Sequence, residues 1–266
     1  MKRLEESFGL RLKWLGCACF EMDFGTLTVV NDPWITPNSK TELTWEAVER
    51  CDYITLTHGH YDHTMDIPVL LEKFEPYLMC GEGTAIPLTR WTNVNPMKVY
   101  PMTPNLELDL GDVKVKALYG RHTPLPGTAQ ERRDKAKEHS TNFLGCDDPD
   151  VIELYRWGDY EYRNYLFTAP NGTKVLIWGN KLARPDQRNI LQEVKPDIAI
   201  MQMTGGNSAA DTAKICREMG CKVVIPHHFD YPKDYTPFVE ALGEELKKQA
   251  PEIRYIVPEY GEWISL

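Results

Sequence analysis

The stretch TLTHGHYDHTMD, Thr55–Asp66, places three of the chain's seven histidines and two aspartates within twelve residues. It overlaps DYITLT (52–57), whose apolar and β-branched residues predict a buried strand. A polar turn that happens to be rich in histidine is the alternative interpretation. Three histidines and an aspartate directly after a buried strand are more typical of a metal site, so we predict that this loop binds metal.

The candidate ligands of the loop, His58, His60, Asp62 and His63, form the pattern H-x-H-x-D-H. His58 and His60 are separated by one residue and can converge on one cation. The adjacent Asp62 and His63 diverge from that pair and can bind a neighbouring cation. Imidazole suits zinc, iron or nickel, and a carboxylate adds charge. We therefore expect one or two Zn²⁺ ions, with Mn²⁺ or iron as the alternatives.

Three more histidines follow predicted strands elsewhere in the chain. His122 comes after KVKALYG, and His227 and His228 come after KVVIP. A site between two sheets would collect ligands from strand ends along the whole chain, so these histidines are candidates to complete the site. His139 lies in a charged stretch, where we expect an ordinary surface side chain.

A weak internal similarity suggests how the chain is organised. MDFGTLTVVND (22–32) resembles APNGTKVLIWGN (169–180), and each predicts a hairpin followed by a helical stretch and an apolar strand. Two such halves predict two sheets packed face to face with helices outside. The pattern predicts further strands at 10–15, 52–57, 77–80, 97–100, 106–110, 113–119, 197–201, 222–226, 253–257 and 262–265, and helices at 44–50, 66–74, 83–90, 208–219 and 234–248.

Composition narrows the class of protein. The 266 residues are 42% apolar, enough for a real core in one domain over 1–266, and the net charge of −9 disfavours nucleic acid as a partner. Glu5 and Glu6 stand where an export signal would be apolar, and no stretch reaches the ~20 apolar residues of a membrane span. We expect a cytoplasmic protein that acts on a small molecule.

The seven cysteines are irregularly spaced, and most lie in apolar runs. We interpret them as reduced core thiols, which are usual in the cytoplasm. A metal-binding pair of Cys17 and Cys19 is the alternative, although C-x-C alone is a weak signal.

Segment 124–163 interrupts the regular pattern directly after His122. It is charged and aromatic, and it carries Arg132 and Arg133. Long irregular segments in compact domains are often lids or binding loops. We predict that this insertion caps the site and that both arginines contact substrate. A charged helix packed on the outside, or an oligomer contact, is the alternative.

With these motifs the chain resembles the metallo-β-lactamase fold superfamily, from KWLGCACF (13–20) to PEYGEW (258–263). Within it, VVNDPW (29–34) and VIPHHFD (224–230) are most similar to ascorbate-6-phosphate lactonase-like hydrolases, and the second motif selects His228 over His227. The resemblance implies an α/β protein with a four-layer αββα sandwich and a homo-oligomer. It also implies two metal positions, one with His58, His60 and His122, and one with Asp62, His63 and His228.

The sequence departs from that family in two places. The family usually has a metal-bridging Asp where IWGNKL has Asn180, and an amide cannot bridge two cations as a carboxylate does. Either the second ion binds weakly, or an anionic substrate meets the extra charge, with Lys181 as a candidate contact. Cys17 stands where the subgroup often has histidine, and we interpret it as buried and structural.

The implied activity is that of a metal-dependent hydrolase, in which a metal-bound hydroxide attacks a small anionic ester or lactone of the sugar-phosphate-lactone type. Asp62 and His228 are the expected catalytic residues. Asp32 and Asp66 are candidates to orient ligand imidazoles, or else they are turn and helix-cap residues. A phosphodiesterase acting on a small phosphodiester and a non-hydrolytic metal sensor or redox protein remain the alternatives.

Overall fold

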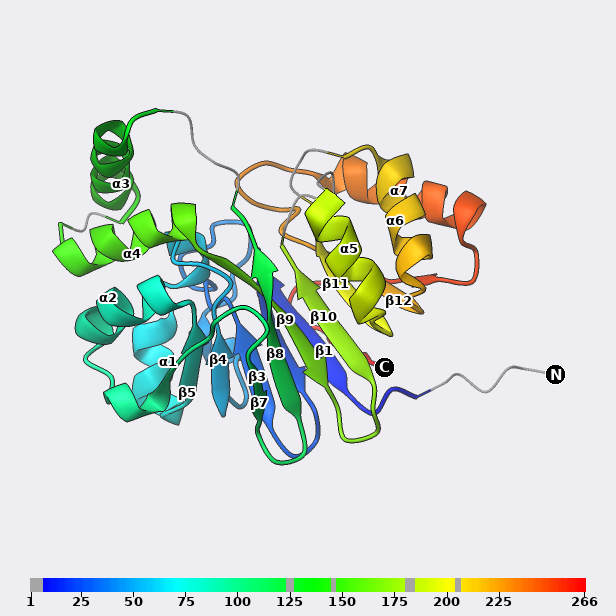
Figure 1. Ribbon diagram of the computed structural model, residues 1–266, viewed down its shortest axis with the longest axis horizontal. Coiled ribbons are helices and arrows are strands. Elements are labelled where there is room, and N and C mark those ends of the chain that lie inside the picture. Colours follow the sequence, from blue (N-terminus) through cyan, green and yellow to red (C-terminus); the bar gives the residue numbers. More distant parts are fainter. Residues whose placement is uncertain (1–6, 123–126, 145–146, 180–184, 204–206) are drawn as a thin grey trace.

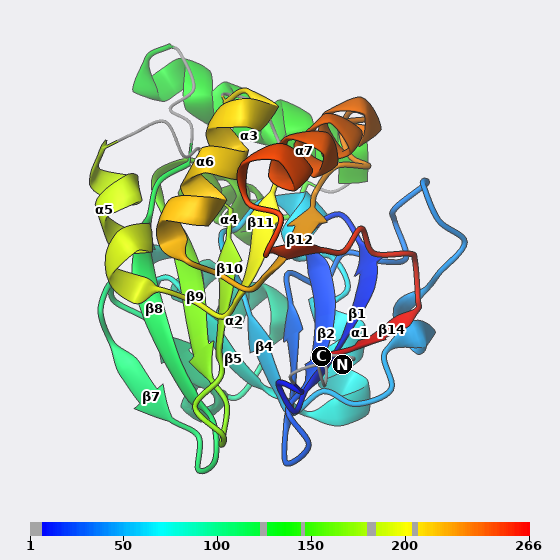
Figure 2. The same ribbon diagram turned by 90° about the vertical axis from the view of Figure 1, so that its right-hand side faces the viewer.

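The computed structural model describes residues 7–122, 127–144, 147–179, 185–203 and 207–266. Within these ranges two seven-stranded sheets pack face to face. Helices cover the outer side of each sheet, which gives four layers in the order αββα (Figures 1 and 2). The predicted α/β four-layer sandwich is confirmed.

The first sheet comes almost entirely from the N-terminal part of the chain, with the last strand added at one edge. The strand order is β14-β1-β2-β3-β4-β5-β6. The strands are β1 (Arg11–Gly16), β2 (Cys19–Asp23), β3 (Thr28–Asn31), β4 (Tyr53–Thr55), β5 (Tyr77–Cys80), β6 (Val99–Pro101) and β14 (Trp263–Ser265).

The second sheet is built from the rest of the chain in the order β13-β12-β11-β10-β9-β8-β7. The strands are β7 (Glu107–Asp109), β8 (Lys114–Gly120), β9 (Tyr162–Thr168), β10 (Lys174–Trp178), β11 (Ile198–Gln202), β12 (Val223–His227) and β13 (Arg254–Tyr255).

The two sheets repeat one pairing pattern. From β1 to β6, two antiparallel pairs are followed by three parallel pairs. The same sequence of pairs runs from β8 to β13. The similar stretches 22–32 and 169–179 carry the turn and the second strand of the corresponding hairpins, β2–β3 and β9–β10. The register of β3 with β4, which aligns Asn31 with Thr55, brings Asp32 beside the start of the histidine loop.

The core lies between the sheets. Trp14, Phe20, Tyr165, Phe167 and Trp178 are its largest fully buried side chains. Burying an apolar side chain of this size contributes about 1.5–3 kcal/mol, so the facing sheets hold the rim loops on a rigid support. The six cysteines in the described ranges are all buried and free, as expected of core thiols.

The helices flank the two sheets on opposite sides of the molecule (Figure 1). None of the described helices has the length and apolar character to cross a membrane. Those beside the first sheet are α1 (Ile67–Phe74) and α2 (Glu82–Thr92), and those beside the second are α5 (Pro185–Val194), α6 (Ala209–Met219) and α7 (Thr236–Gln249). The expected helix at 44–50 is only a 3₁₀ turn, Trp45–Ala47, capped by the Thr44 side chain.

The segment expected to be irregular, 124–163, contains two helices. They are α3 (Ala129–Leu144) and α4 (Pro149–Tyr160), and β9 already begins at Tyr162. Asp148 caps α4 by accepting a hydrogen bond from the Asp150 amide at 2.8 Å. α4 packs against α2 beside the first sheet, and α3 packs on α4 (Figure 1). The expectation of an irregular segment was wrong because charged and aromatic residues obscure the helical period.

Candidate metal centre

The histidine loop leaves β4 and forms a 3₁₀ turn, Tyr61–His63, before α1 begins. His58, His60 and His63 are buried, with 4%, 8% and 1% of their surface exposed. Imidazoles this deeply buried need partners, because an unsatisfied polar group costs free energy in the interior. Those partners come from loops that follow other strands.

We call the meeting point of His58, His60 and His122 the first position. One ring nitrogen from each of these histidines lies within 4.8 Å of the other two. The ring centroids of His60 and His122 are 4.6 Å apart, and those of His58 and His122 are 5.1 Å apart. His122 follows β8, so the first position joins the rims of the two sheets.

We call the meeting point of Cys17, Asp62 and His228 the second position. Their ligand atoms also lie within 4.8 Å of one another. His228 Nε2 is 3.5 Å from Asp62 Oδ2. His228 Nδ1 lies 2.7 Å from the carbonyl oxygen of Tyr231 and therefore donates to it, which leaves Nε2 available to an ion.

His63 lies beside the second position. Its Nε2 is 3.8 Å from Asp62 Oδ2, and its Nδ1 is 2.8 Å from Asp32 Oδ2. The Asp32 carboxylate therefore fixes this ring with Nε2 directed toward Asp62.

Asp32 also orients His58, through Thr57. The Thr57 hydroxyl donates to Asp32 Oδ2 at 2.6 Å, so it must accept from His58 Nδ1, which lies 3.0 Å away. His58 is thereby held with Nε2 available for the first position. One buried carboxylate thus sets one ring of the first position and the His63 ring beside the second, the kind of support that metal-ligating histidines usually have.

The charges of the cluster differ from group to group. Burial and the surrounding histidines lower the pKa of His58 well below its ordinary value. Burial opposes a charge on Asp62 and on His63. The His63 and His228 imidazoles nevertheless lower the pKa of Asp62, and the Asp32 carboxylate, followed by that of Asp62, raises the pKa of His63. The metal-free site therefore favours a charged His63 between the carboxylates of Asp32 and Asp62, beside a neutral His58.

The backbone around the second position is unusual. Cys17, Asp32 and His228 adopt left-handed conformations, with φ of 47°, 46° and 57°. Such conformations cost of order 1–3 kcal/mol each in residues other than glycine and tend to occur at functional sites.

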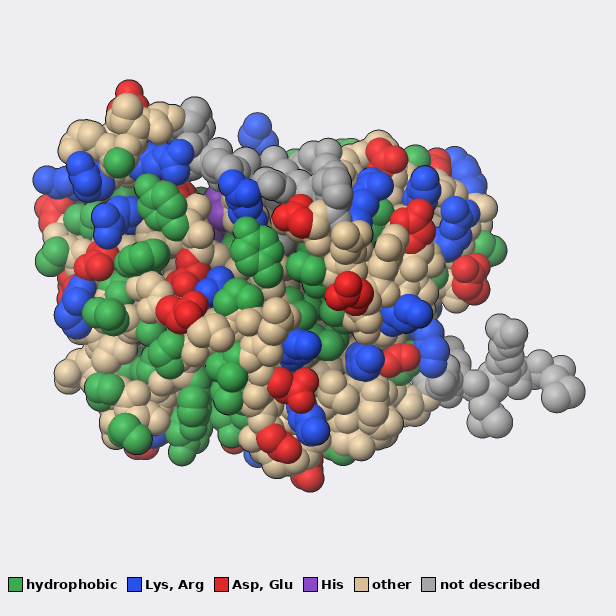
Figure 3. Space-filling model, in the orientation of Figure 1, with side chains coloured by type: hydrophobic (Ala, Val, Ile, Leu, Met, Phe, Trp, Pro, Cys, Tyr) green, Lys and Arg blue, Asp and Glu red, His purple; other side chains and the backbone are tan. Residues whose placement is uncertain are grey.

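The donor set fits divalent transition-metal ions. Imidazole nitrogens, a carboxylate and a thiol are the ligands that zinc and its neighbours prefer, and they converge here with their outer atoms already hydrogen-bonded. A hydrophilic turn would instead expose these side chains. Histidine surface is visible in a hollow at the upper edge of the molecule, with Lys and Arg side chains on either side (Figure 3).

Helix α4 of the insertion packs directly on the histidine loop. A Cβ added to Gly59 would lie 2.3 Å from the Leu154 carbonyl oxygen, and one added to Gly158 would lie 2.4 Å from His60 Cδ2. Only glycine at both places allows this approach. The Tyr155 ring stacks on His60 with centroids 4.4 Å apart.

α4 also supplies a carboxylate. Asp159 Oδ1 lies 3.3 Å from His60 Nε2, which leaves Nδ1 as the His60 nitrogen available to an ion. The other oxygen, Oδ2, is buried and has no hydrogen-bond partner in the described structure.

The remaining predicted residues have varied places. Asn180 and Lys181 lie outside the described residues. Arg132 lies over the Tyr160 ring at 5.6 Å, and Arg133 is exposed and donates to Gln130 at 2.7 Å. Their roles as substrate contacts therefore stay predictions.

Two of the predicted rim residues have structural roles. Asp66 accepts hydrogen bonds from the Ile35 and Thr36 amides at 2.5 and 3.0 Å, a turn-stabilising role. His227 turns away from the cluster and places Nε2 3.3 Å from the Trp178 carbonyl. His228, and not His227, therefore reaches Asp62.

Sequence reasoning missed Cys17 and Asp159 as members of the site. Cys17 was expected to be a structural core thiol, yet its sulfur belongs to the second position. Cys19, the proposed metal-binding partner of Cys17, packs in a different apolar cluster. The sequence held two signals for Cys17, its C-x-C spacing to Cys19 and its place where the resembling subgroup often has histidine, and none for Asp159.

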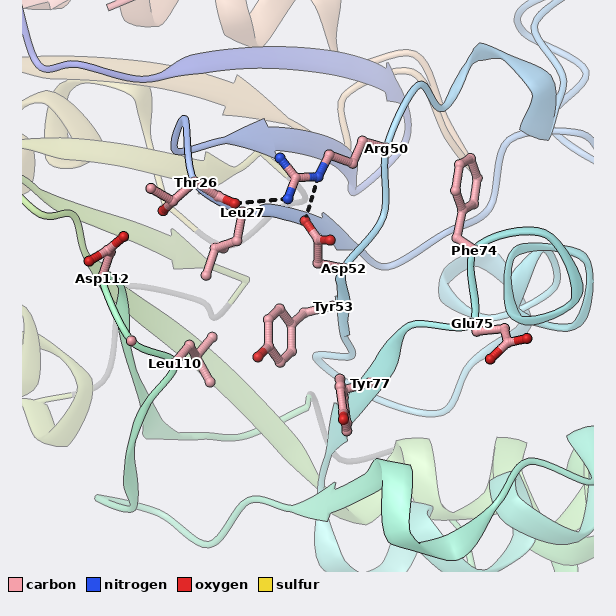
Figure 4. A pocket seen from close by; sticks show the side chains of 11 residues that line it. Thr26, Leu27, Arg50, Asp52, Tyr53, Phe74, Glu75, Tyr77, Leu110 and Asp112 are labelled. Atoms are coloured by element: carbon pink, nitrogen blue, oxygen red, sulfur yellow. Dashed lines mark hydrogen bonds and ion pairs between the residues drawn. The ribbon is translucent and has the colours of Figure 1, made fainter.

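A separate pocket of about 460 Å³ lies away from the histidines (Figure 4). The Arg50–Asp52 ion pair at 2.8 Å and the stacked rings of Tyr53 and Tyr77 line part of it. None of the residues that line it is a histidine or a cysteine, so this pocket is not part of the candidate metal centre.

Residues 28–229 match the family described as "Beta-lactamase superfamily domain". A UPF0173 metal-dependent hydrolase from Koribacter versatilis is 25% identical over 254 residues, covering 90% of this chain and 96% of the relative. The family match, residues 28–229, includes the histidine loop, His122 and His228 but not Cys17.

Two solved structures share the architecture. Igni18, a metallo hydrolase from Ignicoccus hospitalis, has a TM-score of 0.69 at 16% identity, covering 97% of this chain and 98% of that one. CmlA, a diiron β-hydroxylase from Streptomyces venezuelae, has a TM-score of 0.64 at 13% identity, covering 97% of this chain and 54% of that one. At these identities the likeness shows the fold alone, and it confirms the metallo-β-lactamase fold.

Proposed function

The chain belongs to the β-lactamase superfamily, and from that premise we propose that it is a metal-dependent hydrolase of a small anionic ester or lactone. The observation that carries the proposal is the convergence of two triads of ligand atoms from separate segments. The name of the Koribacter relative supports the reaction class but not a substrate.

The predicted ligands fall into two sets, one for each ion. His58, His60 and His122 would hold one ion, and Asp62 and His228, with His63 beside them, would hold a second. Divalent ions at these places would supply Lewis acidity and activate water near neutral pH. We assign Asp62 to orient the attacking water through its carboxylate, and His228, whose Nε2 lies 3.5 Å from Asp62 Oδ2, to bind the same ion as Asp62.

The net charge of the ligand set supports an anionic substrate. The histidine ligands are neutral when they bind metal, and Asp62 is the one carboxylate among the residues of the two positions. The ligands of the two positions alone would therefore keep a net positive charge, which the carboxylates of Asp159 beside His60 and Asp32 beside His63 would reduce. Arg121 is exposed directly beside His122, where it could attract an anion to the rim.

Helix α4 supports a covered site. Leu154 and Tyr155 are buried against the histidine loop, so bulk water is kept from that side of His60. We propose that the insertion 124–163 caps the site, as the sequence suggested. Its basic residues Arg132 and Arg133, and Lys181 outside the described residues, are the proposed substrate contacts.

The test begins with protein stripped of metal by a chelator and reloaded separately with Zn²⁺, Mn²⁺ and Fe²⁺. Each form is assayed on a phosphorylated sugar lactone, an uncharged lactone and bis(p-nitrophenyl) phosphate. We expect metal-dependent turnover, with the highest kcat/KM for the phosphorylated lactone. Preferred turnover of the phosphodiester would move the assignment to a phosphodiesterase.

A non-hydrolytic iron protein is the second candidate. The likeness to CmlA, of which 54% is covered, shows that part of a diiron β-hydroxylase can share this fold. If iron-loaded protein hydrolyses none of the three substrates but consumes oxygen in the presence of a reductant, this candidate replaces the hydrolase.

A further inference from the structure

We propose that Cys17 is a thiolate ligand of the ion at the second position. The inference rests on the proposed function, because it assumes that the protein binds divalent metal. It adds a sulfur donor to the second position, for which the sequence analysis favoured Asp62, His63 and His228 and treated Cys17 as structural.

Geometry places the sulfur in the ligand set. The Cys17 sulfur, an Asp62 oxygen and a His228 nitrogen lie within 4.8 Å of one another. Cys17 is completely buried, and Asp62 and His228 are also largely shielded from solvent. An ion between them would be surrounded by protein donors.

The backbone holds Cys17 and His228 together. The His228 amide donates to the Cys17 carbonyl oxygen at 2.8 Å, and the Cys17 amide donates to Asp230 Oδ2 at 3.0 Å. Asp230 is itself fixed by Asn38 and Tyr260, at 3.2 and 2.9 Å. The end of β1 and the loop after β12 are therefore tied into one rigid unit.

Chemistry favours coordination. A cysteine binds metal as the thiolate, so Cys17 would lose its proton to solvent as the ion enters. The new sulfur–metal bond adds one negative charge to a position that otherwise has one carboxylate. The thiolate thus partly offsets the positive charge of two divalent ions, which neutral imidazoles cannot do.

The alternative is that Cys17 only packs, since it also lies against Ala18 and Trp34 in a small apolar cluster. A matched residue separates the two interpretations. Cys19 is also fully buried and lies two residues further along the chain, but it packs in a different apolar cluster. Cys19→Ser is therefore the control for Cys17→Ser.

The experiment measures metal content, X-ray absorption and the optical spectrum of the whole chain loaded with Zn²⁺ or Co²⁺. We expect two ions per chain, a sulfur neighbour at about 2.3 Å in the zinc protein, and a near-ultraviolet thiolate-to-cobalt band. Cys17→Ser should lose both sulfur signals. Its affinity for the second ion should fall by more than the roughly 10–100-fold that losing an outer partner costs. Cys19→Ser should keep both signals.

Two results would overturn the inference alone: ions bound without a sulfur neighbour in the wild-type protein, or sulfur signals that survive in Cys17→Ser. Because the wild-type spectrum decides by itself, poor folding of a variant would not leave the question open. If the wild-type chain binds no divalent ion, the proposed function fails as well.

Discussion

At the first position three imidazoles converge from two loops, whereas the second position combines a thiol, a carboxylate and one imidazole from three separate segments. The backbone differs too. The second position includes two left-handed residues, Cys17 and His228, and the first includes none. The positions share one support, because Asp32 orients His58 through Thr57 and His63 directly.

The comparison teaches that the two positions depend on different parts of the molecule. Helix α4 packs on His60 and supports the first position. The linked ends of β1 and β12 support the second. Changes in the insertion should therefore affect one ion, and changes at the β1–β12 rim should affect the other.

The largest effect on activity should come from His122→Ala. This substitution removes a ligand of the first position and leaves the residues of the histidine loop unchanged. A metal supplies several kcal/mol to such reactions, so kcat/KM should fall by about 10³-fold or more. Metal analysis should show the first ion lost. Lys248→Gln, which alters an exposed side chain of α7 outside both positions, is the control. Turnover within about twofold of wild type in His122→Ala would show that the first position is not used.

A smaller effect should follow from Gly158→Ala. Its Cβ would clash with His60, so α4 or the loop must shift. Overpacking of this kind costs about 1–3 kcal/mol of stability. We also expect affinity at the first position to fall by up to about 100-fold and affinity at the second to stay unchanged.

Calorimetric metal titration and chemical denaturation measure the two effects of Gly158→Ala. Gly243→Ala, in α7, is the control, because its Cβ would meet the edge of the Tyr255 ring at 3.1 Å and no residue of either position. An equal loss of metal affinity at both positions would contradict the inference that α4 supports only the first.

A paired substitution sharpens the comparison further. Asp159→Asn removes the charge facing His60. The affinity of the first position for its ion should fall by about tenfold, and that of the second should not change. Asp32→Asn should weaken both ions, because Asp32 orients one ring of the first position and the His63 ring beside the second. The same titration tests both variants. If Asp159→Asn lowered the affinity for the second ion alone, our assignment of Asp159 to the first position would be wrong.

The smallest effect concerns the adjacent histidines His227 and His228 in metal-free protein. Burial, with the neighbouring His228, lowers the pKa of His227 to about 3, while its Nε2 contacts the Trp178 carbonyl. The unfolded chain therefore binds this proton more readily than the folded one. The stability that His227 contributes is present above its ordinary pKa near 6.5 and is lost as the pH falls toward about 3.

Denaturation of metal-free wild type and His227→Gln between about pH 6 and pH 5 measures this effect. The free energy of unfolding of the wild type should fall more steeply than that of the variant, by about 1.4 kcal/mol per pH unit. Parallel pH dependences would mean that His227 does not stay neutral in the fold.

Much of the fold could be predicted because its strands carry local signals. The Asn171-Gly172 turn joins β9 to β10 as expected, and the two similar hairpins occupy matching places in the two sheets. The histidine loop was visible because its candidate ligands are close in sequence. His122 and His228 could be proposed from their position at strand ends.

Cys17 and Asp159 could not be assigned in the same way. Cys17 reaches the second position because β1 and β12, which are far apart in the chain, end side by side. Asp159 reaches His60 because Gly158 permits a contact between helix and loop that no sequence period reveals. Both depend on tertiary packing, and a lone cysteine or aspartate carries no spacing signal.

The central claim is that histidines distant in sequence gather divalent ions at two positions on one rim. Anomalous diffraction from crystals of the zinc-loaded chain, collected at the zinc edge, tests it most directly. We predict one peak among His58, His60 and His122 and a second among Cys17, Asp62 and His228. Crystals soaked in zinc that show no peak at either place would contradict the account.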